Sequence, residues 1–165
     1  MIRVGLLGTG RIGRLHAETI ASHSESTLHA VSDIDSGSAN ELAVQYGAAL
    51  KSSEEIISDP NVDAILIATS TDTHSDFIEK ASLAGKAVLC EKPVDLSLSR
   101  AKECLKKVSA ANNPIMIGFN RRFDPNFAQL KKSLDDNEIG KSELLTITSF
   151  DPAPPPVSYV KTSGG

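Results

Sequence analysis

The sequence predicts an α/β fold with a doubly wound parallel sheet. Short apolar runs alternate with helix-like segments from the N-terminus to about residue 118, an order typical of a parallel sheet with right-handed crossover connections. The run at 62–68 (VDAILIA) is apolar on both faces apart from Asp63, as expected for a central parallel strand. A chain of 165 residues, of which 40% are hydrophobic, can bury one core of this kind.

Each expected strand is a short apolar run that ends at a glycine or a polar cluster, where the chain can turn. The expected strands span residues 2–7, 28–32, 48–50, 62–68, 86–90 and 115–118. Helices are expected between them, with apolar residues at helical spacing on one face. Gly47 and Gly85 end two of these helices. Another helix is expected to start at Ser53. Ser97 caps a further helix, and the residues of this helix expected to face the core are Leu98, Ala101, Leu105 and Val108.

A glycine motif, Gly-Thr-Gly-Arg-Ile-Gly, stands directly after the first strand at residues 8–13. Gly8 allows a tight turn, Gly10 lets a pyrophosphate approach the backbone, and Gly13 lets the next helix pack close to the strand. The helix N-terminus offers free N–H groups to the same anion, so those of Arg11 and Ile12 are expected to face it. The motif in this context predicts a Rossmann-type dinucleotide site.

The second expected strand ends at Asp33, about 20 residues after the motif, where a dinucleotide site places the acid that binds the adenosine ribose. A phosphate on that ribose would face this carboxylate. Two like charges about 4 Å apart repel by on the order of 4 kcal/mol at an effective dielectric constant of about 20. Ile34 supplies no cation to offset the repulsion. We therefore predict NAD rather than NADP as the cofactor.

Ligands of a parallel α/β sheet bind beyond the carboxyl ends of its strands. The segments expected to share this edge are 8–13, Asp33, 69–74, 91–93 and 119–122. Thr69 and Ser70 are expected to line the nicotinamide ribose. His74 is a candidate for cofactor binding and equally for a structural hydrogen bond at the start of a helix.

Composition argues against several other classes of protein. The formal net charge is −4 and no basic stripe is present, so a nucleic-acid partner is not expected. The longest purely apolar run, 64–68, is too short to span a membrane, and the chain opens directly into a strand without a signal sequence, so we expect a cytoplasmic location. Cys90 and Cys104 lack metal-ligand spacing and are interpreted as reduced thiols in or near the core, and no metal is expected.

The pattern changes after residue 124. Residues 124–136 are expected to form a helix and 143–150 (ELLTITSF) a strand, which runs into a proline-rich segment rather than another helix. We interpret 1–120 as the NAD-binding domain and 121–165 as the start of a second, α+β domain that is cut short.

The segments 91–93 (EKP) and 118–125 (GFNRRFDP) resemble motifs of the glucose–fructose oxidoreductase/inositol dehydrogenase (Gfo/Idh/MocA) family. The tail, with 151–156 (DPAPPP), Tyr159 and the final Ser-Gly-Gly, is similar to the inositol 2-dehydrogenase branch of that family. The resemblance implies NAD-dependent oxidation of one secondary hydroxyl of a cyclic polyol such as myo-inositol. It also implies a second domain on an open, mainly antiparallel sheet, and a homo-oligomer, often a tetramer.

The resemblance further implies roles for individual residues. Lys92 would be the catalytic lysine, which orients the reacting hydroxyl, joins the proton relay and lies against the cofactor. Arg121 would lie close to the substrate and the nicotinamide. Glu91 is open to a cofactor-side role or to a structural pairing with a nearby cation. The family pattern favours a cis bond between Lys92 and Pro93.

Two departures from the family pattern leave alternatives open. Phe150 stands where relatives commonly carry Arg, before the Asp-Pro of the tail. The family's catalytic aspartate and histidine follow the Ser-Gly-Gly segment, where this sequence ends. The isolated 165-residue chain is therefore expected to bind NAD without turning over a polyol. The alternatives are another sugar dehydrogenase of the same family and a non-catalytic NAD-binding module.

Overall fold

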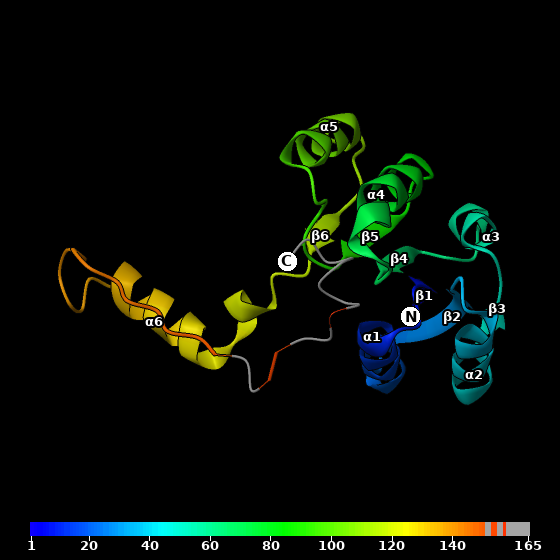
Figure 1. Ribbon diagram of the computed structural model, residues 1–165, viewed down its shortest axis with the longest axis horizontal. Helices are drawn as coiled ribbons and strands as arrows, with labels where there is room; N and C mark the ends of the chain where they lie inside the picture. The colour runs from blue at the N-terminus through cyan, green and yellow to red at the C-terminus, as the bar shows by residue number, and fades with distance from the viewer. Residues whose placement is uncertain (151–152, 155–156, 158–165) are drawn as a thin grey trace.

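The computed structural model describes residues 1–150, 153–154 and 157. A six-stranded sheet lies at its centre, and its paired strands run parallel in the order β3–β2–β1–β4–β5–β6 (Figure 1). This order confirms the predicted doubly wound α/β fold. The strands are β1 (Ile2–Leu7), β2 (Ser26–Ser32), β3 (Ala49–Leu50), β4 (Ala64–Ile67), β5 (Ala87–Cys90) and β6 (Ile115–Ile117).

Helices cover both faces of the sheet. On one face lie α1 (Arg11–Ser22) and α2 (Ser36–Tyr46) (Figure 1). On the other lie α3 (Ser53–Ser58), α4 (His74–Leu83) and α5 (Leu98–Val108). A short 3₁₀ turn, η1 (Thr71–Thr73), leads from β4 into α4. Each face therefore has its own layer of helices, as right-handed crossovers require.

Two apolar cores hold these layers together. Ala17 and Leu42 belong to the core that joins α1 and α2 to the sheet. Ile56, Ile78 and Val108 belong to the core that joins α3, α4 and α5 to the opposite face. Full burial of one such leucine or isoleucine side chain stabilises the fold by about 1.5–3 kcal/mol, so the sheet with its two helix layers is the stable part of the chain.

The ends of the helices follow the chemistry of their residues. Gly47 takes a left-handed conformation with φ of 66°, which a residue without Cβ adopts at low cost, and ends α2 as predicted. The capping box of α3 joins Ser52 and Glu55, one residue earlier than the expected start at Ser53. The sequence thus locates these ends to within one residue.

The inward face of α5 differs from the prediction. Val108 is buried as predicted, but Leu98 is 71% exposed and Leu105 is 45% exposed, and Cys104 is buried instead. Neighbouring residues of a helix point about 100° apart, so a shift of the inward face by one residue exchanges Leu105 for Cys104 at the core. Cys90 is buried as well, and burial raises the pKa of its thiol to about 12, so both cysteines are core thiols as predicted.

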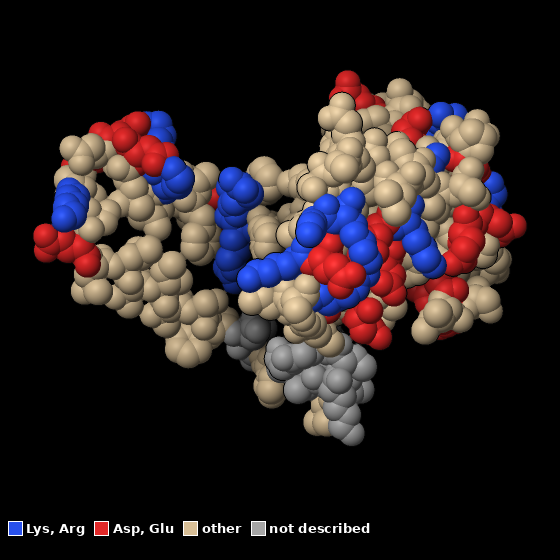
Figure 2. Space-filling model, turned by 90° about the horizontal axis from the view of Figure 1, so that it is seen from above, with Lys and Arg blue, Asp and Glu red and all other residues tan. Residues whose placement is uncertain are grey.

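The chain leaves the sheet after β6 through η2 (Asn120–Phe123) and α6 (Pro125–Asp135), and α6 stands to the side of the sheet-bearing body (Figures 1 and 2). The expected helix is present, but the expected strand at 143–150 is not formed. A strand needs a neighbour to take up its backbone hydrogen bonds, and the described residues supply none here. Leu144 is accordingly 87% exposed. Residues 151–152, 155–156 and Tyr159 lie outside the described residues.

Among the described residues, no helix has the length and apolar character needed to cross a membrane. On the face seen in Figure 2, acidic and basic side chains are interspersed over the sheet-bearing body.

A buried carboxylate anchors the amino edge of the sheet. Asp59, which is 8% exposed, accepts hydrogen bonds from the Lys51 ammonium at 2.6 Å and from the backbone N–H of Asn61 at 2.8 Å. The Lys51 contact is the main reason that the pKa of Asp59 lies well below its ordinary value. The nearly buried Lys86 ammonium donates to the carbonyl oxygens of Asp59 and Val62 at 2.6 and 2.7 Å. This cluster fixes the turn between α3 and β4.

We expect acid to remove this contribution. A carboxyl whose pKa is lowered by folding stabilises the protein above its unfolded pKa of about 3.9, and the stabilisation is lost as the pH falls further. Asp59→Asn should therefore lower the urea midpoint at pH 7 and have a smaller effect at pH 3. Urea unfolding followed by circular dichroism measures both, with Glu18→Gln, an exposed position on α1, as control. An equal loss at both values of pH would contradict the expectation.

Candidate cofactor and active site

The carboxyl ends of five strands are aligned at one edge of the sheet. Leu7 of β1 pairs with Ser32 of β2 and with Ile67 of β4. Cys90 of β5 pairs with Ile67 and with Ile117 of β6. The loops that follow these strands therefore leave the sheet side by side, and the predicted site segments meet at this edge.

The three glycines of the motif differ in what an added side chain would meet. Gly8 has a φ of 96°, and a Cβ there would clash with the backbone of Ala68. A Cβ on Gly13 would clash with the carbonyl of Gly8, so its absence lets α1 lie close to β1. A Cβ on Gly10 would meet nothing within 4 Å. Gly10 therefore leaves an open space over the loop that the fold itself does not need.

This open space lies at the N-terminus of α1. Gly10 is the N-cap and offers no side chain to the helix, and the first intrahelical hydrogen bond runs from the Arg14 N–H to the Gly10 carbonyl at 2.9 Å. The first N–H groups of a helix, here on Arg11, Ile12 and Gly13, have no intrahelical partner and carry partial positive charge. A cradle of this kind fits the pyrophosphate of a dinucleotide.

Asp33 is tied directly to the glycine loop. One carboxylate oxygen accepts from the backbone N–H of Thr9 at 2.5 Å and from its hydroxyl at 3.0 Å, and the other accepts from the N–H of Asp35 at 2.9 Å. Partial burial alone would raise the pKa of Asp33, but these hydrogen bonds outweigh it and lower the pKa. The group is therefore a carboxylate at neutral pH, beside the loop where the ribose is expected.

A cation that the sequence analysis did not single out lies near this end of the site. The hydroxyl oxygens of Thr9 and Ser38 lie 2.9 Å apart, and the Arg14 guanidinium donates to the Ser38 oxygen at 3.0 Å. Arg14 also donates to Glu41 at 2.9 Å. The positive charge nearest to this network is thus already paired, and no motif reveals such a pairing between two helices.

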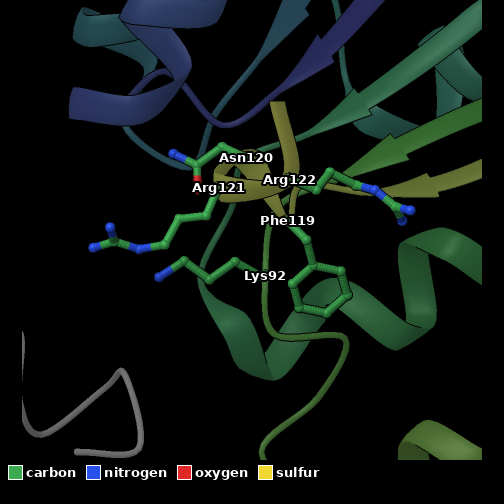
Figure 3. Close-up of a pocket in the computed structure, with 5 residues that line it drawn as sticks. All are labelled: Lys92, Phe119, Asn120, Arg121 and Arg122. Atoms are coloured by element: carbon green, nitrogen blue, oxygen red, sulfur yellow. The ribbon is translucent and has the colours of Figure 1, made fainter. Parts of the chain in front are cut away.

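Lys92 and Arg121 line the same hollow. The hollow has a volume of about 410 Å³ and is lined by Lys92, Phe119, Asn120, Arg121 and Arg122. Figure 3 shows the side chains of Lys92 and Arg121 extending to the same side, whereas Arg122 points away. The Arg121 guanidinium also lies 5.5 Å from the centre of the Phe127 ring on α6. Two positive side chains directed to one side can hold an electron-rich oxygen between them.

Glu91 links three elements behind this hollow. Its carboxylate lies 2.8 Å from Nε2 of His16 on α1, and its second oxygen accepts from the backbone N–H of Lys92 at 3.3 Å. A Cβ on Gly118, just after β6, would lie only 3.3 Å from that carboxylate. The structural pairing left open for Glu91 thus has a concrete partner in the His16 ring.

The loop after β4 faces the loop after β5. The hydroxyls of Thr69 and Thr73 lie 2.7 Å apart, and Thr73 donates to the Ser70 carbonyl at 2.8 Å. His74 is 1% exposed, and its ring nitrogens lie 2.7 Å from the carbonyl oxygen of Pro93 and 3.1 Å from that of Thr69. Its ring therefore lies between the two loops rather than on their surface. The bond between Lys92 and Pro93 is cis, as the family pattern favours.

The glycine loop gives a direct test of cofactor binding. Gly10→Ala should fold normally, because φ at this position is −66° and the added Cβ meets nothing, yet it should weaken NAD binding by about tenfold or more by occupying the cradle. Gly13→Ala should instead lower the melting temperature, since its Cβ meets the Gly8 carbonyl. Calorimetry with NAD and thermal unfolding measure the two effects. NAD binding of unchanged strength in Gly10→Ala would place the pyrophosphate elsewhere.

Proteins similar to this chain were found by sequence and by structure. The chain is 47% identical to inositol 2-dehydrogenase from Rhizobium meliloti and 42% identical to myo-inositol 2-dehydrogenase from Thermotoga maritima, over 99% of its length and 50% of theirs. It superposes on a putative myo-inositol dehydrogenase from Sinorhizobium meliloti with a TM-score of 0.94 at 47% identity, over 100% of this chain and 50% of that chain.

A second similar structure contains ligands. Scyllo-inositol dehydrogenase from Lactobacillus casei, with bound NAD(H) and scyllo-inositol, superposes with a TM-score of 0.80 at 28% identity, over 85% of this chain and 42% of that chain. The chain thus spans about half the length of the relatives that it matches. The model of the Gfo/Idh/MocA oxidoreductase family with an NAD-binding Rossmann fold matches residues 2–119. The chain belongs to this family, which confirms the predicted resemblance and NAD as its cofactor.

Proposed function

We propose that this chain carries the cofactor site and the catalytic lysine of an NAD-dependent dehydrogenase that oxidises a secondary hydroxyl of a cyclic polyol, with myo-inositol as the first substrate to test. The observation that carries the proposal is that Lys92 and Arg121 extend to one side of a hollow at the carboxyl edge of the sheet. The relatives named as inositol dehydrogenases supply the substrate class.

The order of the strands suggests how the dinucleotide lies. Along the edge, the loop after β2 carries Asp33, the next loop carries the glycine motif at 8–13, and the loop after β4 carries Thr69 and Ser70. Lys92 follows on the loop after β5. A dinucleotide laid along this edge would place its adenosine ribose at Asp33, its pyrophosphate over Gly10, and its nicotinamide beside Thr69 and Lys92.

The residues of this chain would then bind and orient the polyol. Bound NAD supplies a hydride acceptor for the carbinol carbon. Lys92 would hold the reacting hydroxyl and pass on its proton, and Arg121 would fix the neighbouring part of the ring. Negative charge that develops on the hydroxyl oxygen would lie between these two cations, which stabilises it.

We also propose a division of the chain into domains and an oligomeric state. We place the NAD-binding domain at 1–120 and assign 121–165 to the start of an incomplete substrate and oligomerisation domain, because α6 follows the last strand and none of its own residues is buried. Membership of the family supports a homo-oligomer, a tetramer for the full-length enzyme. A cytoplasmic location and the absence of a nucleic-acid partner remain part of the proposal.

The negative charge of Asp33 at the expected ribose site should select NAD over NADP. The chain is expected to bind NAD more tightly than NADP, and Asp33→Ala should reduce the ratio of the two affinities by about tenfold or more, because the repulsion of the 2′-phosphate is removed. Asp72→Asn, at an exposed acid on the same edge, is the matched control and should leave the ratio unchanged. Calorimetric titration with both nucleotides measures it. A ratio unaltered by Asp33→Ala would remove this residue from the cofactor site.

The position of Lys92 can be tested without turnover. Saturating NAD, with or without myo-inositol, should slow acetylation of Lys92 by about tenfold or more, because a nicotinamide beside it would cover the amine. Lys106, an exposed lysine on α5, serves as the internal control and should react at its usual rate. Peptide mass spectrometry reports both rates in one sample. Equal acetylation of Lys92 with and without NAD would argue for the alternative, a cofactor-binding module without a catalytic lysine.

A further inference from the structure

His74 occupies an unusual place for a titratable side chain. It is the first residue of α4 and is 1% exposed, yet it lies between two loops of the candidate site rather than in an apolar layer. Its Nδ1 lies 2.7 Å from the carbonyl oxygen of Pro93, and its Nε2 lies 3.1 Å from that of Thr69. A side chain needed only for packing would not have to bury two polar nitrogens, which is costly unless they are hydrogen-bonded.

The two carbonyls belong to the loops that the proposed function places beside the nicotinamide of the cofactor. Thr69 follows β4, and Pro93 is the residue next to Lys92. Ser75, also buried, donates to the carbonyl of Val94 at 3.1 Å, so successive residues of the first turn of α4 bind successive residues of the Lys92 loop. On the other side of Lys92, Glu91 is held by His16.

The Lys92 ammonium itself has no such support. Within the described part of the chain, the hydrogen bond formed by Lys92 is the one from its backbone N–H to Glu91. Its position therefore depends on the backbone of its loop, and the nearest side chain that connects that backbone to the loop after β4 is His74.

We propose that His74 is a positioning residue: its Nδ1–H donates to the Pro93 carbonyl and so ties the Lys92 loop to the start of α4, into which the Thr69 loop leads. This link sets the distance between the lysine and the nicotinamide end of the cofactor. This inference rests on the proposed function for the role of Lys92, but the bridge itself does not. A carbonyl oxygen can only accept, so the ring must donate, and we place a ring proton on Nδ1 because its contact is the shorter.

The first test reads the ring directly. In the ¹⁵N spectrum of the labelled chain, His74 should show a protonated Nδ1 whether or not NAD is present. A ring protonated at Nε2 alone would leave the Pro93 carbonyl without a donor and would overturn the proposal. Because this measurement needs no cofactor, it remains decisive even if the chain fails to bind NAD, a result that would count against the proposed function instead.

The second test separates positioning from general stability. His74→Phe removes the ring donor at similar size. We expect it to raise the dissociation constant for NAD about tenfold while leaving that for AMP within about twofold, because AMP reaches only the Asp33 end of the site. Ser82→Ala is the control and should change neither, because this position on α4 is equally buried and its hydroxyl has no hydrogen-bond partner among the described residues.

A third variant keeps the test decisive if His74→Phe does not fold. His74→Gln retains an amide that donates, and its NAD affinity should lie between those of the wild type and the phenylalanine variant. Unchanged NAD binding in a folded His74→Phe, or an equal loss of NAD and AMP in either His74 variant, would overturn the positioning role.

Discussion

The close approach of α1 to β1 is the constraint on which the candidate site depends. Gly13 lies so near the carbonyl of Gly8 that any side chain would force the helix away from the strand. Because the helix can begin at the very edge of the sheet, its free N–H groups open onto the same edge as the loops after β2, β4 and β5. The parallel register of the strands then aligns those loops, so one packing contact and one sheet topology create the whole edge.

Charge is distributed along this edge in a consistent order. A carboxylate held ionised by the glycine loop lies at the β2 end, and two cations, Lys92 and Arg121, lie at the β5 and β6 end. The first favours a ribose with free hydroxyls over a phosphorylated one. In the proposed reaction, the second would favour an oxygen that becomes negative. The two ends of the site thus have opposite electrostatic tasks, which suits a dinucleotide with distinct ends.

The predictable part of the structure is the part specified by local patterns. Alternating strands and helices, the glycine motif and Asp33 follow from spacing and residue type, and the structure places them together as the topology requires. The strand expected at 143–150 does not form, because a strand depends on a neighbouring strand. A local sequence pattern does not show whether such a neighbour is present. The prediction that Leu105 faces the core is wrong, because a shift of the inward face of α5 by one residue puts Cys104 there instead.

Long-range side-chain pairs account for what the sequence does not reveal in the site. His16 and Glu91 are distant in sequence, and their pairing depends on how α1 crosses the end of β5. The link from Arg14 to Ser38 and Glu41 likewise depends on the spacing of two helices. His74 was recognisable as a candidate, but its two carbonyl partners became visible only with both loops in place.

The most direct test is a crystal structure of this chain with NAD. We predict adenosine ribose hydroxyls hydrogen-bonded to Asp33, the pyrophosphate over Gly10 at the N-terminus of α1, and the nicotinamide in contact with Lys92. A cofactor bound in the reverse direction, or one whose nicotinamide lies away from the Lys92 loop, would contradict the assignment of this edge as the active site.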